Sequence, residues 1–187
     1  MNSVLNYLTE ETMLNNTLRR IEVVPYDPAW KTAFESLKAM LNGILGDLVI
    51  AIEHVGSTSV EGLAAKPIID IDVVMESYAV FPDIVTRLAE AGFKHRGDLG
   101  IAGREAFKRT FDDGFMTYHL YVCPKGGEEL TRHIALRDYL RTHPDARDEY
   151  GALKMANAEK YRYDIDGYIE AKGPFIRGIM EKTIYKD

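Results

Sequence analysis

Two aspartates in one apolar run, Asp70 and Asp72, are the side chains of this sequence best suited to chemistry. The run spans residues 68–75 and predicts a strand, so both carboxylates share one face while the alternating aliphatic side chains share the other. Two carboxylates this close repel each other, and their burial is costly unless a cation neutralises them. Mg²⁺ and Mn²⁺ prefer such oxygen ligands, and Mg²⁺ usually meets proteins through one or two carboxylates plus substrate phosphates. The pair therefore predicts a site for Mg²⁺ (or Mn²⁺), although a strand with one solvated face would also carry acids there.

A glycine–serine turn begins at Gly56, 14 residues before Asp70. Gly56 would let backbone N–H groups approach a phosphate closely. Hydroxyl donors follow at the next three positions, Ser57, Thr58 and Ser59. Such turns also commonly cap a helix, so the turn by itself supports either interpretation. Together with the acidic strand it predicts a site for a metal-bound nucleoside triphosphate.

The third acid of a polymerase-like two-metal site would be expected on a neighbouring strand. The residues Asp112, Asp113 and Gly114 predict a hairpin turn, and the returning strand, 116–122, is the candidate neighbour. It contains no acid, and His119 is its best placed polar residue. A neutral imidazole can ligate a metal or accept a proton, but it brings no negative charge. A hydrogen-bonded histidine beside the core is the alternative, so the residues leave catalytic activity open.

Cationic side chains that could meet phosphates are spread along the chain. Those singled out for phosphate binding are Lys66, Arg104, Lys108, Arg137 and Lys172. A guanidinium group suits planar, bidentate contact with a phosphate. The alternative is a solvated face on which these side chains pair with nearby acids.

Composition favours an ordinary globular protein of 187 residues. The net charge of −6 argues against a general nucleic-acid binder, although a local basic pocket stays compatible with it. Cys123 is the single cysteine, so no intrachain disulfide can form and a reducing compartment is expected. No stretch approaches the roughly 20 apolar residues of a membrane span, and the first residues do not resemble a signal peptide. We therefore expect a cytoplasmic protein without a membrane partner.

Hydrophobic periodicity predicts the elements that position these residues. The predicted strands are 21–26, 48–54, 68–75, 93–96, 105–111 and 116–122. The predicted helices are 3–16, 28–45, 60–64, 81–91, one from 128, one after 144, and 165–180. This order divides the chain into a lead-in (1–19), an α/β core (20–124) and a C-terminal helical segment (125–187), which together form one compact domain.

A longer stretch resembles a known family. Residues 52–60 read Ile-Glu-His-Val-Gly-Ser-Thr-Ser-Val, and residues 62–72 continue from Gly-Leu-Ala-Ala-Lys-Pro to the two aspartates. This stretch resembles the GrpB family, also called UPF0157. The resemblance continues at 25–30, 119–122 and 132–141, and covers about residues 20 to 180.

The resemblance implies an α+β protein of the nucleotidyltransferase-like superfold, with a mixed β-sheet, helices packed on one side and a C-terminal helical segment. It implies that Gly56 and Ser57 form the phosphate-binding turn and that Asp70 and Asp72 hold the metal. His119 falls where many nucleotidyltransferases carry their third acid.

The function implied is binding of a nucleoside triphosphate with Mg²⁺ and nucleotidyl transfer to an unknown acceptor. The alternative is a non-catalytic nucleotide-binding or regulatory module. A link to coenzyme A metabolism is a further possibility, because related domains occur fused to dephospho-CoA kinase. The sequence does not specify the acceptor, the preferred base or the oligomeric state.

Overall fold

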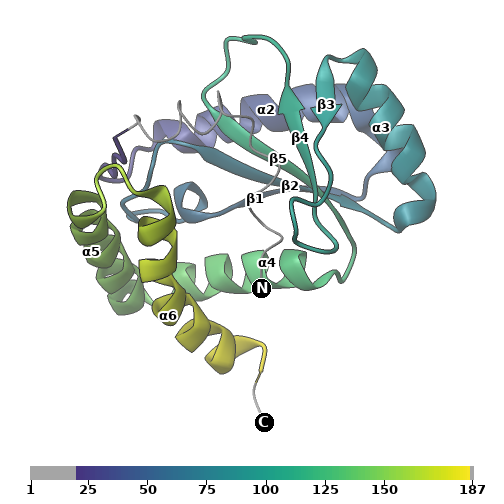
Figure 1. The fold of residues 1–187 in the computed structure, drawn as a ribbon. Coiled ribbons are helices and arrows are strands. Elements are labelled where there is room, and N and C mark those ends of the chain that lie inside the picture. Colours follow the sequence, from purple (N-terminus) through teal and green to yellow (C-terminus); the bar gives the residue numbers. More distant parts are fainter. Residues whose placement is uncertain (1–19, 186–187) are drawn as a thin grey trace.

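The centre of the fold is a mixed sheet of five strands in the order β1-β2-β5-β4-β3 (Figure 1). The strands are β1 (Ala51–Val55), β2 (Ile69–Met75), β3 (Phe93–His95), β4 (Glu105–Arg109) and β5 (Tyr118–Pro124). Strands β2 and β5 pair in parallel, and the other three pairings are antiparallel. The computed structural model describes residues 20–185, so the helix predicted at 3–16 lies outside the described residues.

Helices cover both faces of this sheet. They are α2 (Ala29–Leu45), α3 (Phe81–Glu90), α4 (Glu128–Thr142), α5 (Pro144–Lys160) and α6 (Ile165–Thr183). Helices α2 and α3 cover one face, α4 runs along the other, and α5 and α6 extend beyond α4 (Figure 1). The mixed α+β sheet with a C-terminal helical segment confirms the predicted fold class. No helix within residues 20–185 combines the length and apolar character needed to cross a membrane.

The apolar stripe of α2 decides which face of β2 is left for the aspartates. Asp27 Oδ1 accepts a hydrogen bond from the Ala29 N–H at 2.9 Å, and the helix ends at Gly46 as predicted. The buried side chains of α2 pack against one face of β2, which presents Ile69, Ile71 and Val73. Because side chains alternate along a strand, Asp70 and Asp72 point to the opposite face, toward α4.

Three local predictions were wrong. Residues 21–26 form no strand but a single bridge, Val24 to Ala65, because Pro25 lacks the N–H that would extend the pairing. Residues 46–48 form a short 3₁₀-helix, so β1 begins only at Ala51. The helical turn expected at 60–64 lies earlier, at Ser57–Ser59, because the left-handed Gly56 (φ +69°) turns the chain immediately after β1.

A hydrogen-bonded chain fixes the turn between β1 and β2. The Thr58 hydroxyl donates to the Ile68 carbonyl at 3.1 Å, so its oxygen accepts from His54 Nε2–H at 3.0 Å. The His54 ring stacks on Phe34 of α2, with centroids 4.5 Å apart. Helix α2, strand β1 and the start of β2 are thereby tied to the turn.

Acidification should destabilise the protein through His54. Burial lowers its pKa to about 4, with Arg141 and Arg137 acting in the same direction and Asp70 opposing them. Between pH 6.5 and 4 the unfolded chain therefore binds a proton that the folded chain does not, and stability falls as the pH falls. One pH unit of separation is worth about 1.4 kcal/mol, so the loss reaches about 3 kcal/mol by pH 4.

Denaturant unfolding of the wild type and His54→Gln at pH 7 and pH 4 measures this effect. We expect a smaller acid-induced loss in His54→Gln, because glutamine does not titrate. Equal losses in the two proteins would contradict the assignment.

Candidate nucleotide and metal site

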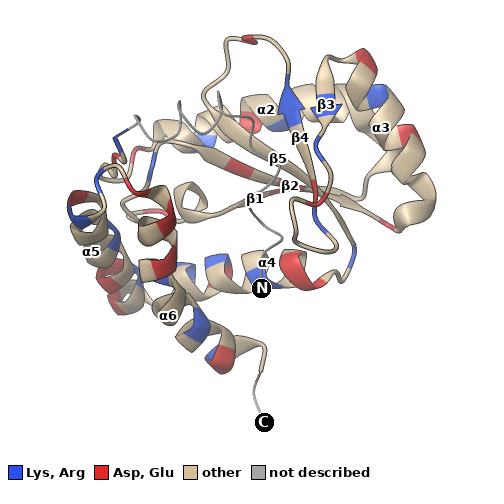
Figure 2. Ribbon diagram, in the orientation of Figure 1, with Lys and Arg blue, Asp and Glu red and all other residues tan. Residues whose placement is uncertain are grey.

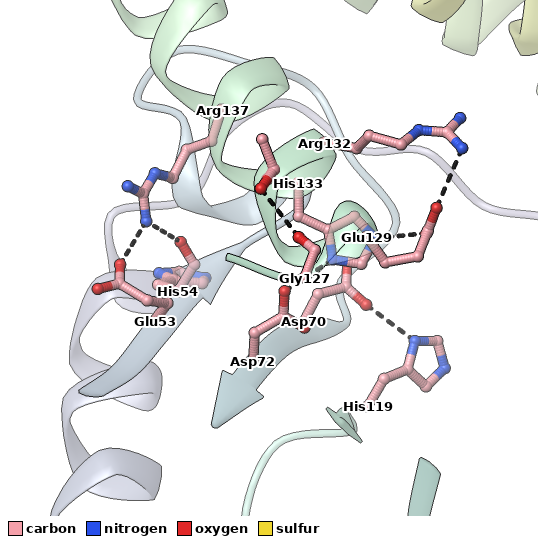
Figure 3. Close-up of polar contacts among 11 residues, drawn as sticks. Glu53, His54, Asp70, Asp72, His119, Gly127, Glu129, Arg132, His133 and Arg137 are labelled. Carbon is pink, nitrogen blue, oxygen red and sulfur yellow. Dashed lines mark hydrogen bonds and ion pairs between the residues drawn. The ribbon is translucent and has the colours of Figure 1, made fainter. Parts of the chain in front are cut away.

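The two aspartates differ in burial, and each is held by a histidine (Figure 3). The Asp70 side chain is 32% exposed, and its Oδ1 accepts from His119 Nδ1 at 2.8 Å. The Asp72 side chain is fully buried, and its Oδ2 accepts from His133 Nδ1 at 2.7 Å. The parallel pairing of β2 with β5 places Asp70 directly opposite His119, as the sequence placed it.

His133 on α4 is the partner of the buried Asp72 and can carry positive charge there. Burial opposes the charged imidazolium, but the hydrogen bond to Asp72 and the charges of Asp72, Glu129 and Asp70 outweigh it, so the pKa of His133 is raised. Its Nε2 lies 3.7 Å from Glu129 Oε2, one helical turn earlier on α4. Asp72, His133 and Glu129 form a continuous polar path from the sheet to the helix.

The aspartate pair suits a divalent cation that is shared with a substrate. Asp72 Oδ1 is buried and has no hydrogen-bond partner among residues 20–185, which is unusual for a buried carboxylate oxygen. In the same part of the chain no three His, Cys, Asp or Glu side chains cluster closely enough to hold a metal ion by themselves. Asp70 and Asp72 therefore fit the mode in which Mg²⁺ is held by two carboxylates together with substrate phosphates.

Gly56 packs directly against the Asp70 carboxylate. A Cβ at this position would lie 2.2 Å from Asp70 Oδ2, closer than atoms can approach, and φ of +69° is a conformation that favours glycine. Gly56 and Asp70 are 14 residues apart in the sequence and were predicted to form one site, and the structure places them in van der Waals contact.

A cavity of about 240 Å³ adjoins Asp70 and receives three lysines, so we call it the lysine cavity. Lys66 comes from the loop before β2, Lys154 from α5 and Lys172 from α6. Ser57 and Asp70 also line it, which leaves three cationic side chains against one carboxylate. Figure 2 shows basic residues on α4, α5 and α6, the helices on the side of the sheet that carries the aspartates.

The lysines are held in an environment that disfavours their charge. Burial lowers the pKa of Lys154 to about 7, and the charge of Lys172 acts in the same direction while Asp70 opposes it. Burial likewise lowers the pKa of Lys172 to about 8 and also lowers the pKa of Lys66. Lys154 is only 2% exposed, and its Nζ has no hydrogen-bond partner within residues 20–185. Asp70 is the one carboxylate in the lining that opposes this effect.

A second cavity, of about 320 Å³, meets the lysine cavity at Asp70. Ser57, Asp70 and Lys172 line both cavities, and no other lining residue is common to them. The second cavity otherwise lies between α4 and α6, so we call it the helical cavity.

Several residues assigned to phosphate from the sequence have other contacts. Thr58 and Ser59 donate their hydroxyl hydrogens to the carbonyls of Ile68 and Gly56, so these hydroxyls stabilise the turn itself. Ser57 lines both cavities and is the hydroxyl of the turn placed to meet a ligand from either side.

The predicted cations divide in the same way. Lys66 and Lys172 line the lysine cavity, and Arg137 lines the helical cavity, where it pairs with Glu53 and Asp138. Arg104 instead lies over the Tyr121 ring, 4.3 Å from its centroid, beyond the linings of the two cavities. Lys108 is exposed on β4, away from both cavities, because alternation along this outer part of the sheet turns it to solvent.

Three functional candidates were not singled out from the sequence. They are Lys154, Glu129 and His133. The spacing of Glu129 and His133 places both on one face of α4, but that pattern also suits an exposed ion pair. Lys154 lies among aromatic residues at helical spacing, and only the packing of α5 shows that its amine is buried.

The mixed sheet and its helices define an α+β protein with a nucleotidyltransferase-like fold. A chain of the GLD-2/RNP-8 complex superposes with a TM-score of 0.54 at 13% identity, covering 83% of this chain and 61% of that one, a likeness of fold alone. The family is narrower: the model described as GrpB protein matches residues 20–182, and the chain belongs to the GrpB family.

Relatives and a solved structure agree with this membership. The UPF0157 protein YqkA of Bacillus subtilis (strain 168) is 34% identical over 165 residues, which cover 88% of this chain but only 48% of YqkA. The glutamate-rich protein GrpB of Alkalihalophilus pseudofirmus is 35% identical over 173 residues, covering 91% of this chain and 99% of that protein. A dephospho-CoA kinase of Mycolicibacterium paratuberculosis is 27% identical over 186 residues, covering 87% of this chain and 46% of the kinase. The crystal structure of the conserved protein GrpB from Enterococcus faecalis superposes with a TM-score of 0.76 at 34% identity, covering 86% and 96% of the two chains.

The contact between Gly56 and Asp70 predicts opposite effects for two glycine substitutions. Gly56→Ala should lower the free energy of unfolding by about 2 kcal/mol or more, because the methyl group collides with the carboxylate and the backbone is strained. Gly43→Ala in α2 is the matched control: its Cβ would meet nothing within 4 Å, so a gain of about 0.5–1 kcal/mol is expected. Urea unfolding measures both, and a neutral Gly56→Ala would contradict the packing described.

Proposed function

We propose that this protein binds a nucleoside triphosphate together with Mg²⁺ at the junction of the two cavities. The phosphates occupy the lysine cavity, and Asp70 and Asp72 face the metal. The observation that carries this proposal is Lys154, a buried amine without a hydrogen-bond partner among the described residues, with two further lysines around the same cavity. A buried unpaired cation is costly, and an anionic ligand would offset that cost.

The chemistry that fits this arrangement is nucleotidyl transfer. An acceptor hydroxyl oxygen would form a bond to the α-phosphorus while the bond from that phosphorus to the bridging oxygen breaks and pyrophosphate leaves. The hydroxyl proton would pass to a carboxylate of the site. The chain's own contribution is to position the phosphates through Ser57 and the lysines and to neutralise the charge of the leaving pyrophosphate. Bound Mg²⁺ would add Lewis-acid stabilisation of the phosphate oxygens.

Binding without catalysis is the alternative. His119 stands opposite Asp70 where a third acid would complete the metal site, and a neutral imidazole supplies no charge there. A regulatory or sensing module would use the same pocket. The similarity to a dephospho-CoA kinase adds coenzyme A precursors as a ligand class to test for such a module. We also propose a cytoplasmic location, which suits both nucleotide supply and the buried free thiol of Cys123.

Nucleotide binding is tested by thermal unfolding with each of the four nucleoside triphosphates, with and without Mg²⁺. A ligand at 100 times its Kd adds about 2.7 kcal/mol of stability. We expect Asp70→Asn to weaken Mg²⁺-dependent binding at least about tenfold, because a charge-assisted contact worth about 1.4 kcal/mol or more is lost.

Asp83→Asn, an exposed acid on α3 at the opposite face, is the matched control and should bind like the wild type. Release of pyrophosphate in the presence of acceptors separates an enzyme from a binding module. Absence of any stabilisation by all four nucleotides would contradict both.

Lys154→Met should stabilise the ligand-free protein and weaken nucleotide binding. The folded pKa near 7 lies below the unfolded value, so the buried amine costs most below pH 7 and nothing above about pH 10.5. Replacing it with an apolar side chain of similar length should add about 1–4 kcal/mol at pH 7, and the gain should shrink as the pH rises toward 10. The affinity for MgATP should fall about tenfold or more, as the loss of a charge-assisted contact requires.

Lys160→Met is the control for this change. Lys160 lies on the same helix and over a tyrosine ring, as Lys154 does, but it is exposed. For Lys160→Met, calorimetry should show little change in the affinity for MgATP, and denaturant unfolding should show little change in stability. A Lys154→Met protein that is less stable and binds MgATP normally would reject the proposed role.

A further inference from the structure

We propose that the helical cavity receives the acceptor, and that the acceptor is a small, weakly charged alcohol with an apolar body. This inference rests on the proposed function, since it assigns the second substrate of the same site. The inference goes beyond the proposed function because it names the class of acceptor, which is a small molecule and not the end of a polymer chain.

The direction of attack places the acceptor. In phosphoryl and nucleotidyl transfer the attacking and leaving oxygens lie roughly in line on either side of the phosphorus. If the leaving pyrophosphate occupies the lysine cavity, the attacking hydroxyl approaches the α-phosphorus from the other cavity. The two cavities share only Ser57, Asp70 and Lys172, so Asp70 lies at the boundary that a transferred group would have to cross.

The lining of the helical cavity describes the body of the acceptor. Part of its lining is aliphatic, with Leu136 and Leu140 from α4 and Ile176 and Met180 from α6. The Tyr150 ring also lines it, stacks on Phe175 and lies 4.6 Å from Lys154 Nζ of the lysine cavity. Asp70 and Ser57 belong to its polar part. A hydroxyl on a hydrocarbon or ring body matches this polarity, with the hydroxyl at the aspartate and the body among the aliphatic side chains.

The two arginines that line the helical cavity are already paired with carboxylates, unlike the lysines of the lysine cavity. Arg132 bonds to Glu129 at 3.0 Å, and Arg137 bonds to Glu53 and Asp138, both at 2.7 Å. An acceptor with several phosphates would compete with these carboxylates and gain little. The pairing therefore favours an acceptor of low charge.

The size of the helical cavity favours a small molecule. Its volume of about 320 Å³ lies at the small end of the range for small-molecule sites. Its walls are packed helices: α4 and α6 contact each other, and Leu140 and Met180 are each 2% exposed. A nucleic-acid strand needs an extended, positively charged groove, which these walls do not provide.

The test uses 2-phenylethanol as the probe and ethylene glycol, which lacks an apolar body, as its control. Saturation-transfer NMR on the full chain measures binding of each. We expect 2-phenylethanol to bind the wild type and ethylene glycol to give no signal. Ile176→Trp fills the helical cavity and should weaken 2-phenylethanol binding at least tenfold.

Met155→Trp is the matched variant, because Met155 is an exposed aliphatic residue on α5 outside both cavities. It should bind 2-phenylethanol within twofold of the wild type. Thermal unfolding shows whether Ile176→Trp is folded. If it is not, Leu136→Phe replaces it, with the same weakening expected.

Three outcomes would overturn the inference. They are no binding of 2-phenylethanol to the wild type, binding that the cavity-filling variant leaves unchanged, and binding of a six-residue oligoadenylate that the same variant abolishes. The alcohol is measured without nucleotide, and MgATP binding to the wild type and to Met155→Trp is measured separately, with equal affinities expected. Loss of MgATP binding in the wild type would reject the proposed function, whereas loss of the alcohol alone would reject only this inference.

Discussion

The contact between the Gly56 backbone and the Asp70 carboxylate is the constraint on which the site depends. It brings a turn that ends one strand against an acid in the middle of the next, with no space for a side chain between them. A hydrogen bond between His54 and Thr58 stabilises the turn, and His119 on the neighbouring strand hydrogen-bonds to Asp70. Asp70 lines both cavities and is the one carboxylate common to them.

The site is assembled at a cost in stability. Asp72 is fully buried with one oxygen unpartnered among the described residues, and Lys154 is buried with an unpartnered amine. Local conflicts of this kind are expected where a protein is adapted to a ligand and not only to its own fold. The opposite face of β2 shows a different pattern: it is aliphatic and packs closely against α2. One face of β2 therefore contributes to the stability of the core, whereas the other face carries the aspartates of the candidate site.

Much of this arrangement could be read from the sequence, because short-range patterns carry it. The alternation of β2 placed both aspartates on one face, and Asp27 with Gly46 bounded α2. The hairpin signal at Gly114 placed His119 on the strand beside Asp70. Local patterns were less reliable at two positions where backbone geometry decides the structure. The helical turn begins directly after the left-handed Gly56 and not at residue 60, and the segment that contains Pro25 forms a single bridge and not a strand. The burial of Lys154 and the pairing of His133 with Asp72 depend on how α4, α5 and α6 dock, which no local pattern encodes.

The origin of the three lysines has a consequence for biosynthesis. Lys66 precedes β2, whereas Lys154 and Lys172 come from the last two helices, so the cavity has all of its cationic walls only after most of the chain has left the ribosome. A nascent chain that has formed the sheet but not yet docked α5 and α6 would hold the aspartates and Lys66 without the other two amines. Recruitment of a polyphosphate ligand would then be one of the last steps of maturation, and it would favour chains whose helical half has closed over the sheet.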